Sequence, residues 1–414
     1  ETALPIHFHT HDSAGVQAAA VLKATEAGLD IADAASGPLS GMTSQPIMDG
    51  IVEALRFTKR DTGLDGEALQ QIAEYWEAAR DFYQPFEAGM RAASADVYRH
   101  EMPGGQTTNL RQQAASLGLA SRWHEICRAY EDANRLLGDV IKVTPSSKAI
   151  GDLALYLVTN NLSADAILTS ERELAFPDSV VELVAGGLGQ PHGGFPPKVR
   201  QRILRGQKPK RGRPGAGLPA ADLKAVRATL SDELGRPASR RDVLSHLMFP
   251  KVFAEFSAHE DRYSDVSVLP TPSFLYGLEP GEETVVEIER GKTLLIRLVA
   301  IGEPNDDGVR TIFFELNGQP RHVTVQDRQL TASAPAHVQA DPADPKQLAA
   351  AMPGLVTLVA VKPGDRVSRG EKLLSLEAMK METSIYAERD GEVAEVLVHP
   401  GTQVVAGDLV IRLA

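Results

Sequence analysis

The sequence predicts a multidomain protein that combines an α/β region with two all-β regions. Three observations predict this fold class. Strand and helix patterns alternate over residues 5–57, strand patterns separated by tight turns cover residues 283–327, and a repeated strand pattern fills residues 354–414. Strands that alternate with helices are typical of parallel sheets, whereas consecutive strands form antiparallel sandwiches or barrels.

The first region, residues 1–125, is expected to contain three βα units. Candidate strands and helices alternate, in the order β, α, β, α, β, at residues 5–11, 16–27, 29–35, 45–57 and 96–102. Repeated βα units form a parallel sheet or a (β/α)8 barrel, with function at the carboxyl ends of the strands. Three strands cannot close a barrel, so we expect five strands before Glu1 and no independent function of residues 1–125.

The three regions that follow differ in pattern. Residues 126–262 have apolar residues at helical spacing and are expected to be a helical extension. Residues 263–330 carry four strand patterns and are expected to form a compact β module. Strong hairpin-forming pairs lie between these strands, at Arg290-Gly291, Asp307-Gly308 and Asn317-Gly318. Residues 331–349 are rich in Ala and Pro without an apolar period, and are expected to be a linker.

Residues 350–414 contain a two-fold repeat. The pattern of residues 354–364 recurs at residues 391–401, an offset of 37 residues, and both copies end in Pro-Gly. Neither half can bury its apolar face alone, so the two are expected to pack into one small flattened β-barrel. Lys380 lies in the joint between the halves, within the sequence Glu-Ala-Met-Lys-Met-Glu.

Lys380 has a plain interpretation, because an exposed lysine on a hairpin usually contributes only to solubility. Its two flanking methionines, its place at the midpoint of the repeat and the Met352-Pro353-Gly354 that opens the module resemble the biotin carboxyl carrier domains. Lipoyl domains share the two-fold fold but do not usually flank their lysine with two methionines. The resemblance implies covalent biotin on Lys380, attached by a biotin protein ligase.

Composition limits the class of protein. Cys127 is the single cysteine, which excludes a disulfide within the chain and is typical of a reducing compartment. The net charge of −12 argues against a nucleic-acid partner. The short basic run of Lys208, Lys210, Arg211 and Arg213 is therefore expected to be a solvated loop. No apolar run is long enough to span a bilayer, so no membrane partner is expected.

The segment His7-Phe-His9-Thr-His11-Asp12 carries the second chemical signal. In an extended strand its three histidines lie on one side, so the segment can place two imidazoles on one metal ion. Histidines on a strand more often form hydrogen bonds in a core. His9 and His11 lie where the strand gives way to a turn, at the functional edge of such a sheet, so we expect them to bind metal and His7 to be structural.

Taken together, these features resemble the pyruvate carboxylases, over essentially the whole chain and in the same order of modules. The resemblance rests on the His-x-His-Asp segment and on four further motifs, at residues 39–46, 100–106, 143–148 and 249–253. It identifies the N-terminal part as the end of a carboxyltransferase barrel of the (β/α)8 type. The family usually has Thr followed by Ser or Ala and Gly after His-x-His-Asp; this chain has Ser13-Ala14-Gly15, which we expect to be tolerated.

The resemblance implies roles for single residues. His9 and His11 match the two metal-binding histidines of the family, which holds zinc or manganese together with an aspartate and a carbamylated lysine from earlier strands. Thr144 matches the threonine that relays a proton between the methyl group of pyruvate and N1 of biotin, although Thr-Pro-Ser-Ser alone would suggest a cap or turn. Lys148 matches a residue near the biotin pocket.

The resemblance also implies the reaction and the partners. Such an enzyme is a ligase that carboxylates pyruvate to oxaloacetate with biotin; ATP, magnesium and bicarbonate act at a biotin carboxylase domain that this chain lacks. The β module at residues 263–330 matches the allosteric and tetramerisation domain, which implies acetyl-CoA as activator and a homotetramer. The location implied is the cytoplasm for a bacterial protein, or the mitochondrial matrix for a eukaryotic one.

Two alternatives remain open. Carboxyltransferase subunits of oxaloacetate decarboxylase and of transcarboxylase also join a barrel to a biotinyl module. They usually lack a β module such as residues 263–330, and their metal strand differs around His-x-His. The other alternative is a biotin carrier with only a scaffold role, which supplies its arm to partner chains.

Overall fold

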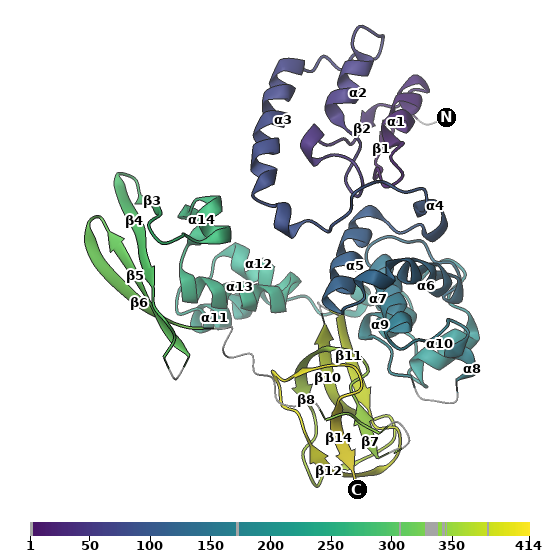
Figure 1. Ribbon diagram of the computed structural model, residues 1–414. Helices are drawn as coiled ribbons and strands as arrows, with labels where there is room; N and C mark the ends of the chain where they lie inside the picture. Colours follow the sequence, from purple (N-terminus) through teal and green to yellow (C-terminus); the bar gives the residue numbers. More distant parts are fainter. Residues whose placement is uncertain are drawn as a thin grey trace. The chain divides into compact units, whose positions relative to one another are not determined.

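The structure is a computed structural model with two compact units (Figure 1). It describes residues 3–170, 174–305, 308–327, 338–341, 344, 346–378 and 381–414. The first unit comprises Glu1–Ala216 and Ala336–Ala414, and the second comprises Gly217–Pro335. Within these described ranges, every helix is too short or too polar to cross a membrane.

The first unit begins with a short pair of parallel strands. β1 (His7–Phe8) pairs with β2 (Ile31–Ala32), and α1 (Gln17–Glu26) connects them. α2 (Met48–Leu55) and α3 (Gly66–Asp81) follow. The order strand, helix, strand, helix agrees with the first two expected βα units, although each strand has only two residues.

Residues 96–102 do not form the expected third strand. α4 (Val97–His100) occupies this segment, and the backbone N–H groups of His100 and Glu101 donate to the carbonyls of Asp96 and Val97 at 3.2 and 2.7 Å. A strand needs a neighbouring strand to accept its N–H groups, whereas a helical turn satisfies them locally. The prediction of a third strand is therefore wrong, and among the described residues this parallel sheet has two strands.

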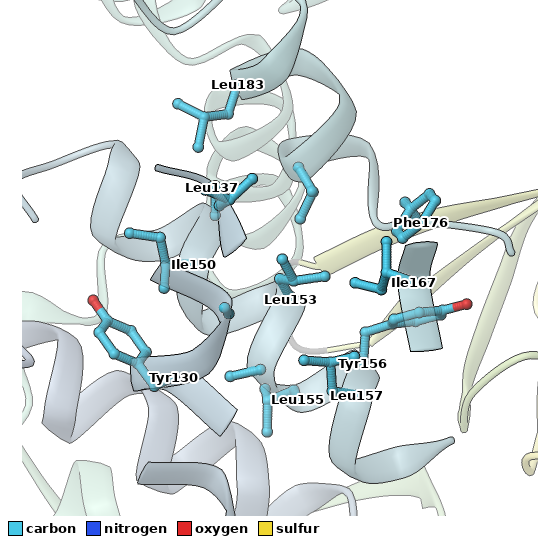
Figure 2. Packing of buried hydrophobic residues seen from close by; sticks show 14 of the residues in the cluster. Tyr130, Leu137, Ile150, Leu153, Leu155, Tyr156, Leu157, Ile167, Phe176 and Leu183 are labelled. Carbon is cyan, nitrogen blue, oxygen red and sulfur yellow. The ribbon is translucent and has the colours of Figure 1, made fainter. Parts of the chain in front are cut away.

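A helical region follows and contains the main apolar core of the first unit. Its helices are α5 (Gly104–Ser116), α6 (Trp123–Leu136), α7 (Ser146–Thr159), α8 (Ala166–Thr169), α9 (Asp178–Val184) and α10 (Pro197–Leu204). Every residue of α7 from 149 to 158 is buried, as expected for a helix surrounded by others. Figure 2 shows side chains of α7 packed among those of Tyr130, Leu137, Ile167 and Phe176.

The second unit combines α-helices with one antiparallel sheet. The helices are α11 (Leu223–Glu233), α12 (Arg240–Met248), α13 (Pro250–Tyr263) and α14 (Thr271–Tyr276). The strands are β3 (Glu283–Glu289), β4 (Lys292–Ile301), β5 (Val309–Leu316) and β6 (Gln319–Gln326). The sheet order follows the chain, as expected for consecutive hairpins. Asn317 and Gly318 both have positive φ, 47° and 78°, which is the turn geometry that Asn-Gly favours.

The first unit ends in two antiparallel sheets of four strands each. In chain order the strands are β7 (Gln347–Ala349), β8 (Gly354–Val359), β9 (Arg366–Val367), β10 (Lys372–Ala378), β11 (Met381–Tyr386), β12 (Gly391–Val396), β13 (Gln403–Val404) and β14 (Leu409–Leu413). The sheet orders are β11-β10-β8-β13 and β7-β14-β12-β9. β8, β9 and β10 begin at 354, 366 and 372, and β12, β13 and β14 begin 37 residues later, at 391, 403 and 409. The sequence repeat is therefore a repeat of strands.

The remaining helical turns are of the 3-10 type. They are η1 (Gly37–Leu39), η2 (Gln84–Phe86), η3 (Ala120–Arg122), η4 (Pro214–Gly217) and η5 (Val266–Val268).

Candidate functional site

One carboxylate organises two of the three N-terminal histidines. Asp33, directly after β2, accepts hydrogen bonds from His7 Nε2 at 2.8 Å and from His9 Nδ1 at 2.7 Å. These two hydrogen bonds, that from His7 first, lower the pKa of Asp33, so the carboxylate is ionised at neutral pH. An ionised carboxylate only accepts, so Nδ1 of His9 donates, and Nε2 is the ring nitrogen that this contact leaves unused.

His11 is oriented by the backbone. Its Nδ1 donates to the carbonyl oxygen of Thr43 at 2.6 Å, which leaves Nε2 as its unused ring nitrogen. The start of α5 lies directly against this contact. A Cβ atom at Gly104 would lie 2.5 Å from His11 Nδ1 and 2.6 Å from the Thr43 carbonyl oxygen. Only glycine therefore leaves room for the imidazole between the loop and the helix.

The donor set fits two positions of a metal site. His9 and His11 both present Nε2, and their ring centroids are 5.3 Å apart. A carboxylate or a backbone carbonyl on the other ring nitrogen is typical of metal-binding histidines. His7 uses its Nε2 for Asp33. Searched over the described residues alone, no group of three His, Cys, Asp or Glu side chains could hold a metal ion, so further ligands would have to come from other residues.

Thr144 is an exposed residue just before α7. The helix has Pro145 at its N-cap position and no capping side chain, so Thr144 does not act as the cap that its local sequence suggests. Ser146 instead holds the loop, because its Oγ donates to the carbonyl oxygens of Ile141 and Val143 at 2.6 and 2.7 Å. The Thr144 side chain is therefore not needed to start the helix.

Lys148 is held by a buried acid one turn further along α7. Its Nζ donates to Asp152 Oδ2 at 2.7 Å, and Ser179 Oγ of α9 donates to the same oxygen at 2.6 Å. Burial raises the pKa of Asp152, and the charge of Lys148 opposes this shift. The Lys148 side chain remains 42% exposed, so its ammonium group is held by Asp152 and is still accessible to solvent.

Lys380 lies outside the described residues, but the strands on both sides of it are described. β10 ends at Ala378 and β11 begins at Met381, and these two residues are antiparallel partners. β11 also contacts α9, because Ser384 Oγ of the strand donates to Asp178 Oδ2 of the helix at 3.2 Å. Asp178 precedes Ser179, so the strand after Lys380 and the acid that holds Lys148 contact neighbouring residues of one helix.

The histidines and α7 are linked by α5. Its first residue, Gly104, packs on His11, and its Gln106 packs on α7, where a Cβ at Gly151 would lie 2.6 Å from Gln106 Nε2. The sequence alone does not reveal the roles of Asp33, Gly104 and Asp152. An acidic residue at the end of the strand beside the histidine strand was the signal for Asp33, and an acid four residues after Lys148 was the signal for Asp152.

Comparison with known proteins gives two domain matches. Residues 97–297 match the family model described as "Conserved carboxylase domain", and residues 346–413 match the one described as "Biotin-requiring enzyme". The pyruvate carboxylase of Bacillus subtilis is 43% identical over 99% of this chain, which covers 36% of that protein. The human "Pyruvate carboxylase, mitochondrial" is also 43% identical, over 99% of this chain and 35% of the human protein. The chain thus spans about a third of the length of these curated relatives.

Solved structures show the same similarity. The complete multifunctional pyruvate carboxylase from Rhizobium etli superimposes with a TM-score of 0.73 and 48% identity, over 99% of this chain and 38% of that one. The carboxyl transferase domain of the same enzyme, solved with pyruvate and biocytin, gives a TM-score of 0.74 and 50% identity, over 79% of this chain and 55% of that one.

The two domain matches define the class of protein, a biotin-dependent carboxylase. The identity to pyruvate carboxylases extends over essentially the whole chain. The chain therefore belongs to the pyruvate carboxylase family and corresponds to its C-terminal part.

Proposed function

We propose that this chain is the carboxyltransferase and carrier part of an enzyme that carboxylates pyruvate to oxaloacetate with biotin. One observation carries the proposal: the carboxylase match at residues 97–297 and the biotin-requiring match at residues 346–413 occur in one chain. The rest of such an enzyme would contain the biotin carboxylase domain, which uses ATP, magnesium and bicarbonate. Pyruvate and oxaloacetate are the proposed small-molecule partners, and a biotin protein ligase would modify Lys380.

In this reaction the weakly acidic methyl group of pyruvate must lose a proton while its carbonyl is polarised. Zinc or manganese held by His9 and His11 would, when bound, withdraw electrons from that carbonyl, and biotin on Lys380 would supply the carboxyl group. Asp33 and the Thr43 carbonyl orient the two imidazoles.

Two residues at the start of α7 have the remaining proposed roles. Thr144 would hold the transferred proton at its hydroxyl oxygen. Its side chain suits this role because Thr144 is exposed and its hydroxyl does not cap the helix. Lys148 would contact the biotin ring, for which an ammonium group fixed by Asp152 and still partly exposed is suited.

The family also suggests the finer architecture. We infer that the N-terminal βα units (residues 1–125) belong to a (β/α)8 barrel, extended by helices up to residue 262. Residues 263–330 would form the allosteric and tetramerisation module, with acetyl-CoA as activator and a homotetramer as the assembly. A linker would join it to the flattened two-fold barrel. The segment predicted as linker, residues 331–349, is too long at its end, because β7 (Gln347–Ala349) already pairs with β14 of that barrel. A bacterial protein of this kind would be cytoplasmic, and a eukaryotic one would lie in the mitochondrial matrix.

The test uses the full-length polypeptide that contains this chain. Oxaloacetate formation is followed by coupling to malate dehydrogenase, with ATP, bicarbonate and pyruvate present. We expect activity that Lys380→Arg abolishes and that Thr144→Ala lowers by about 10²- to 10⁴-fold, the usual contribution of a positioned proton-transfer group. Thr144→Ser keeps the hydroxyl and should restore much of it. Bicarbonate-dependent ATP cleavage, which does not need Thr144, should persist in Thr144→Ala.

Full carboxylation by Thr144→Ala would contradict the proposed proton relay. The alternatives give different results in the same assay. A decarboxylase or transcarboxylase subunit would consume oxaloacetate without ATP, and a carrier with only a scaffold role would be biotinylated but would leave oxaloacetate unchanged.

A further inference from the structure

One segment of this acidic chain is strongly basic. Residues 183–221 contain no Asp or Glu, although the chain as a whole has a net charge of −12. Their eight cationic residues are Lys198, Arg200, Arg202, Arg205, Lys208, Lys210, Arg211 and Arg213. Arg202 has a structural use, because it donates to the carbonyl oxygens of Ile167 and Ser170 at 3.1 and 2.7 Å, and Arg205 likewise donates to Leu174. The other six cationic residues are exposed.

Three of these cations line one cavity. Arg200, Lys210 and Arg211 surround a cavity of about 350 Å³, together with the glycine-rich loop at residues 185–194. Among the residues that the structure describes, no acidic side chain lines this cavity. Phe195 and Pro191 contribute an apolar wall. The volume is that of a site for a small molecule or part of one, rather than for a polymer.

The cavity is held open by fixed contacts between its two sides. The backbone N–H of Lys210 donates to the Ala185 carbonyl at 2.7 Å. Gln190 Nε2 donates to the carbonyl oxygens of Lys210 and Gly212 at 3.0 and 3.2 Å. Gly186 has a φ of 84°, a backbone conformation that favours glycine, and it lies beside the Lys210 carbonyl oxygen. These hydrogen bonds join the basic segment to the glycine-rich loop through its backbone, while the side chains of Lys208, Lys210, Arg211 and Arg213 are exposed, as expected for a solvated loop.

Glu182 is the acid nearest to this arrangement. Its side chain and Lys210 Nζ both lie against Gly187, within 3.0 and 3.2 Å of the position that a Cβ would take. Glu182 is thus a single carboxylate beside the three exposed cations that line the cavity. Like charges held together repel, and a bound anion with more than one charge would remove that repulsion.

We propose that the cavity between residues 185–194 and 209–211 binds a small ligand through a diphosphate group. Arginine matches phosphate oxygens with paired N–H donors, and lysine adds a point charge. A glycine-rich loop lets phosphate oxygens come close to the backbone. A single carboxylate would compensate one of the three cations, and the overall negative charge of the chain disfavours a nucleic acid.

The test is titration calorimetry of the 414-residue chain at low ionic strength, with pyrophosphate and with ADP as probes. We expect saturable binding at one site. The double variant Lys210→Ala/Arg211→Ala should weaken it by about tenfold or more, because two charge-assisted contacts are lost. The control Lys208→Ala/Arg213→Ala removes the same charge from residues outside the cavity lining and should bind nearly as the parent does. Glu182→Gln should tighten binding.

Tighter binding of ADP than of pyrophosphate would assign the site to an organic diphosphate, and equal affinity would mean that the diphosphate group is recognised alone. Absence of saturable binding would overturn the proposal. So would equal losses in the two double variants, because binding would then follow net charge. A single-stranded oligonucleotide that binds more tightly than either probe would overturn it as well.

Discussion

The carrier part (residues 346–414) and the N-terminal part (residues 3–96) are both built on strands, but they bury them very differently. In the carrier, Leu374 and Ile411 lie in different sheets and are both 0% exposed. At the N-terminal strand pair, Ile6 and Ile31 are 50% and 47% exposed. Because burial of apolar surface is the main stabilising term in folding, the carrier has its own core, whereas the N-terminal pair leaves apolar surface uncovered.

The two parts are therefore held in place by different kinds of contact. The carrier repeats one pattern of strands at an offset of 37 residues, so each half covers the apolar face of the other. The N-terminal histidines depend on polar and steric contacts from distant segments, namely Asp33, Thr43 and Gly104. Substitutions should therefore lower stability in the carrier part and change the geometry of the histidine site in the N-terminal part.

The largest expected effect is on the carrier core. Leu374→Ala should lower the free energy of unfolding of the carrier by about 2–5 kcal/mol, since it removes a fully buried side chain and leaves a cavity. The matched change at the strand pair, Ile31→Ala, should cost no more than about 0.5 kcal/mol. Scanning calorimetry of the chain would measure both losses of stability. Equal losses would contradict the claim that the carrier strands are buried more effectively than the N-terminal pair.

The next effect concerns the packing of α5 on His11. Gly104→Ala would place a Cβ atom 2.5 Å from His11 Nδ1, so the imidazole or the helix must move, at a cost of about 1–3 kcal/mol. Gly105 has no atom within 4 Å of the equivalent position, so Gly105→Ala should stabilise α5 by up to about 1 kcal/mol. Thermal unfolding of both variants tests the pair. A change in melting temperature of the same sign in both variants would show that the contact between Gly104 and His11 is unimportant.

A smaller effect is expected when His9 loses its carboxylate. Asp33→Asn removes the charge that fixes the His9 ring, and such changes lower metal affinity by about 10- to 100-fold. Zinc binding by the full-length polypeptide, measured by competition with a chromophoric chelator, reports the change. His7→Ala keeps the contact between Asp33 and His9 and should lower affinity less. A larger loss in His7→Ala would reverse the roles assigned to the two histidines.

The smallest effect is a pH dependence in the helical core. Burial raises the pKa of the Cys127 thiol to about 11, from an ordinary value of 9.0. The thiolate is the reactive form, so alkylation by iodoacetamide should be slow at pH 8 and should rise by about tenfold for each pH unit up to that value. In urea the same thiol should react at the ordinary rate. A reaction that levels off near pH 9 in the folded chain would show that Cys127 is not protected.

Sequence reasoning succeeded where structure is local or repeated. The Asn317-Gly318 turn and the repeat of residues 354–364 depend on neighbouring residues or on a pattern that occurs twice. It failed at residues 96–102, because a short mixed segment becomes a strand only if a partner strand is present. The contact between Asp33 and His9 joins residues 24 apart, and the space that Gly104 leaves for His11 spans 93 positions, so no local pattern reveals either one.

The central claim is that this chain carries biotin on Lys380, the residue between the paired strands β10 and β11. Co-expression with a biotin protein ligase, followed by peptide mass spectrometry, tests it most directly. We predict a biotin adduct on Lys380, and an unmodified chain when Lys380→Arg is expressed in the same way. An unmodified parent chain, or an adduct on any other lysine, would contradict the claim.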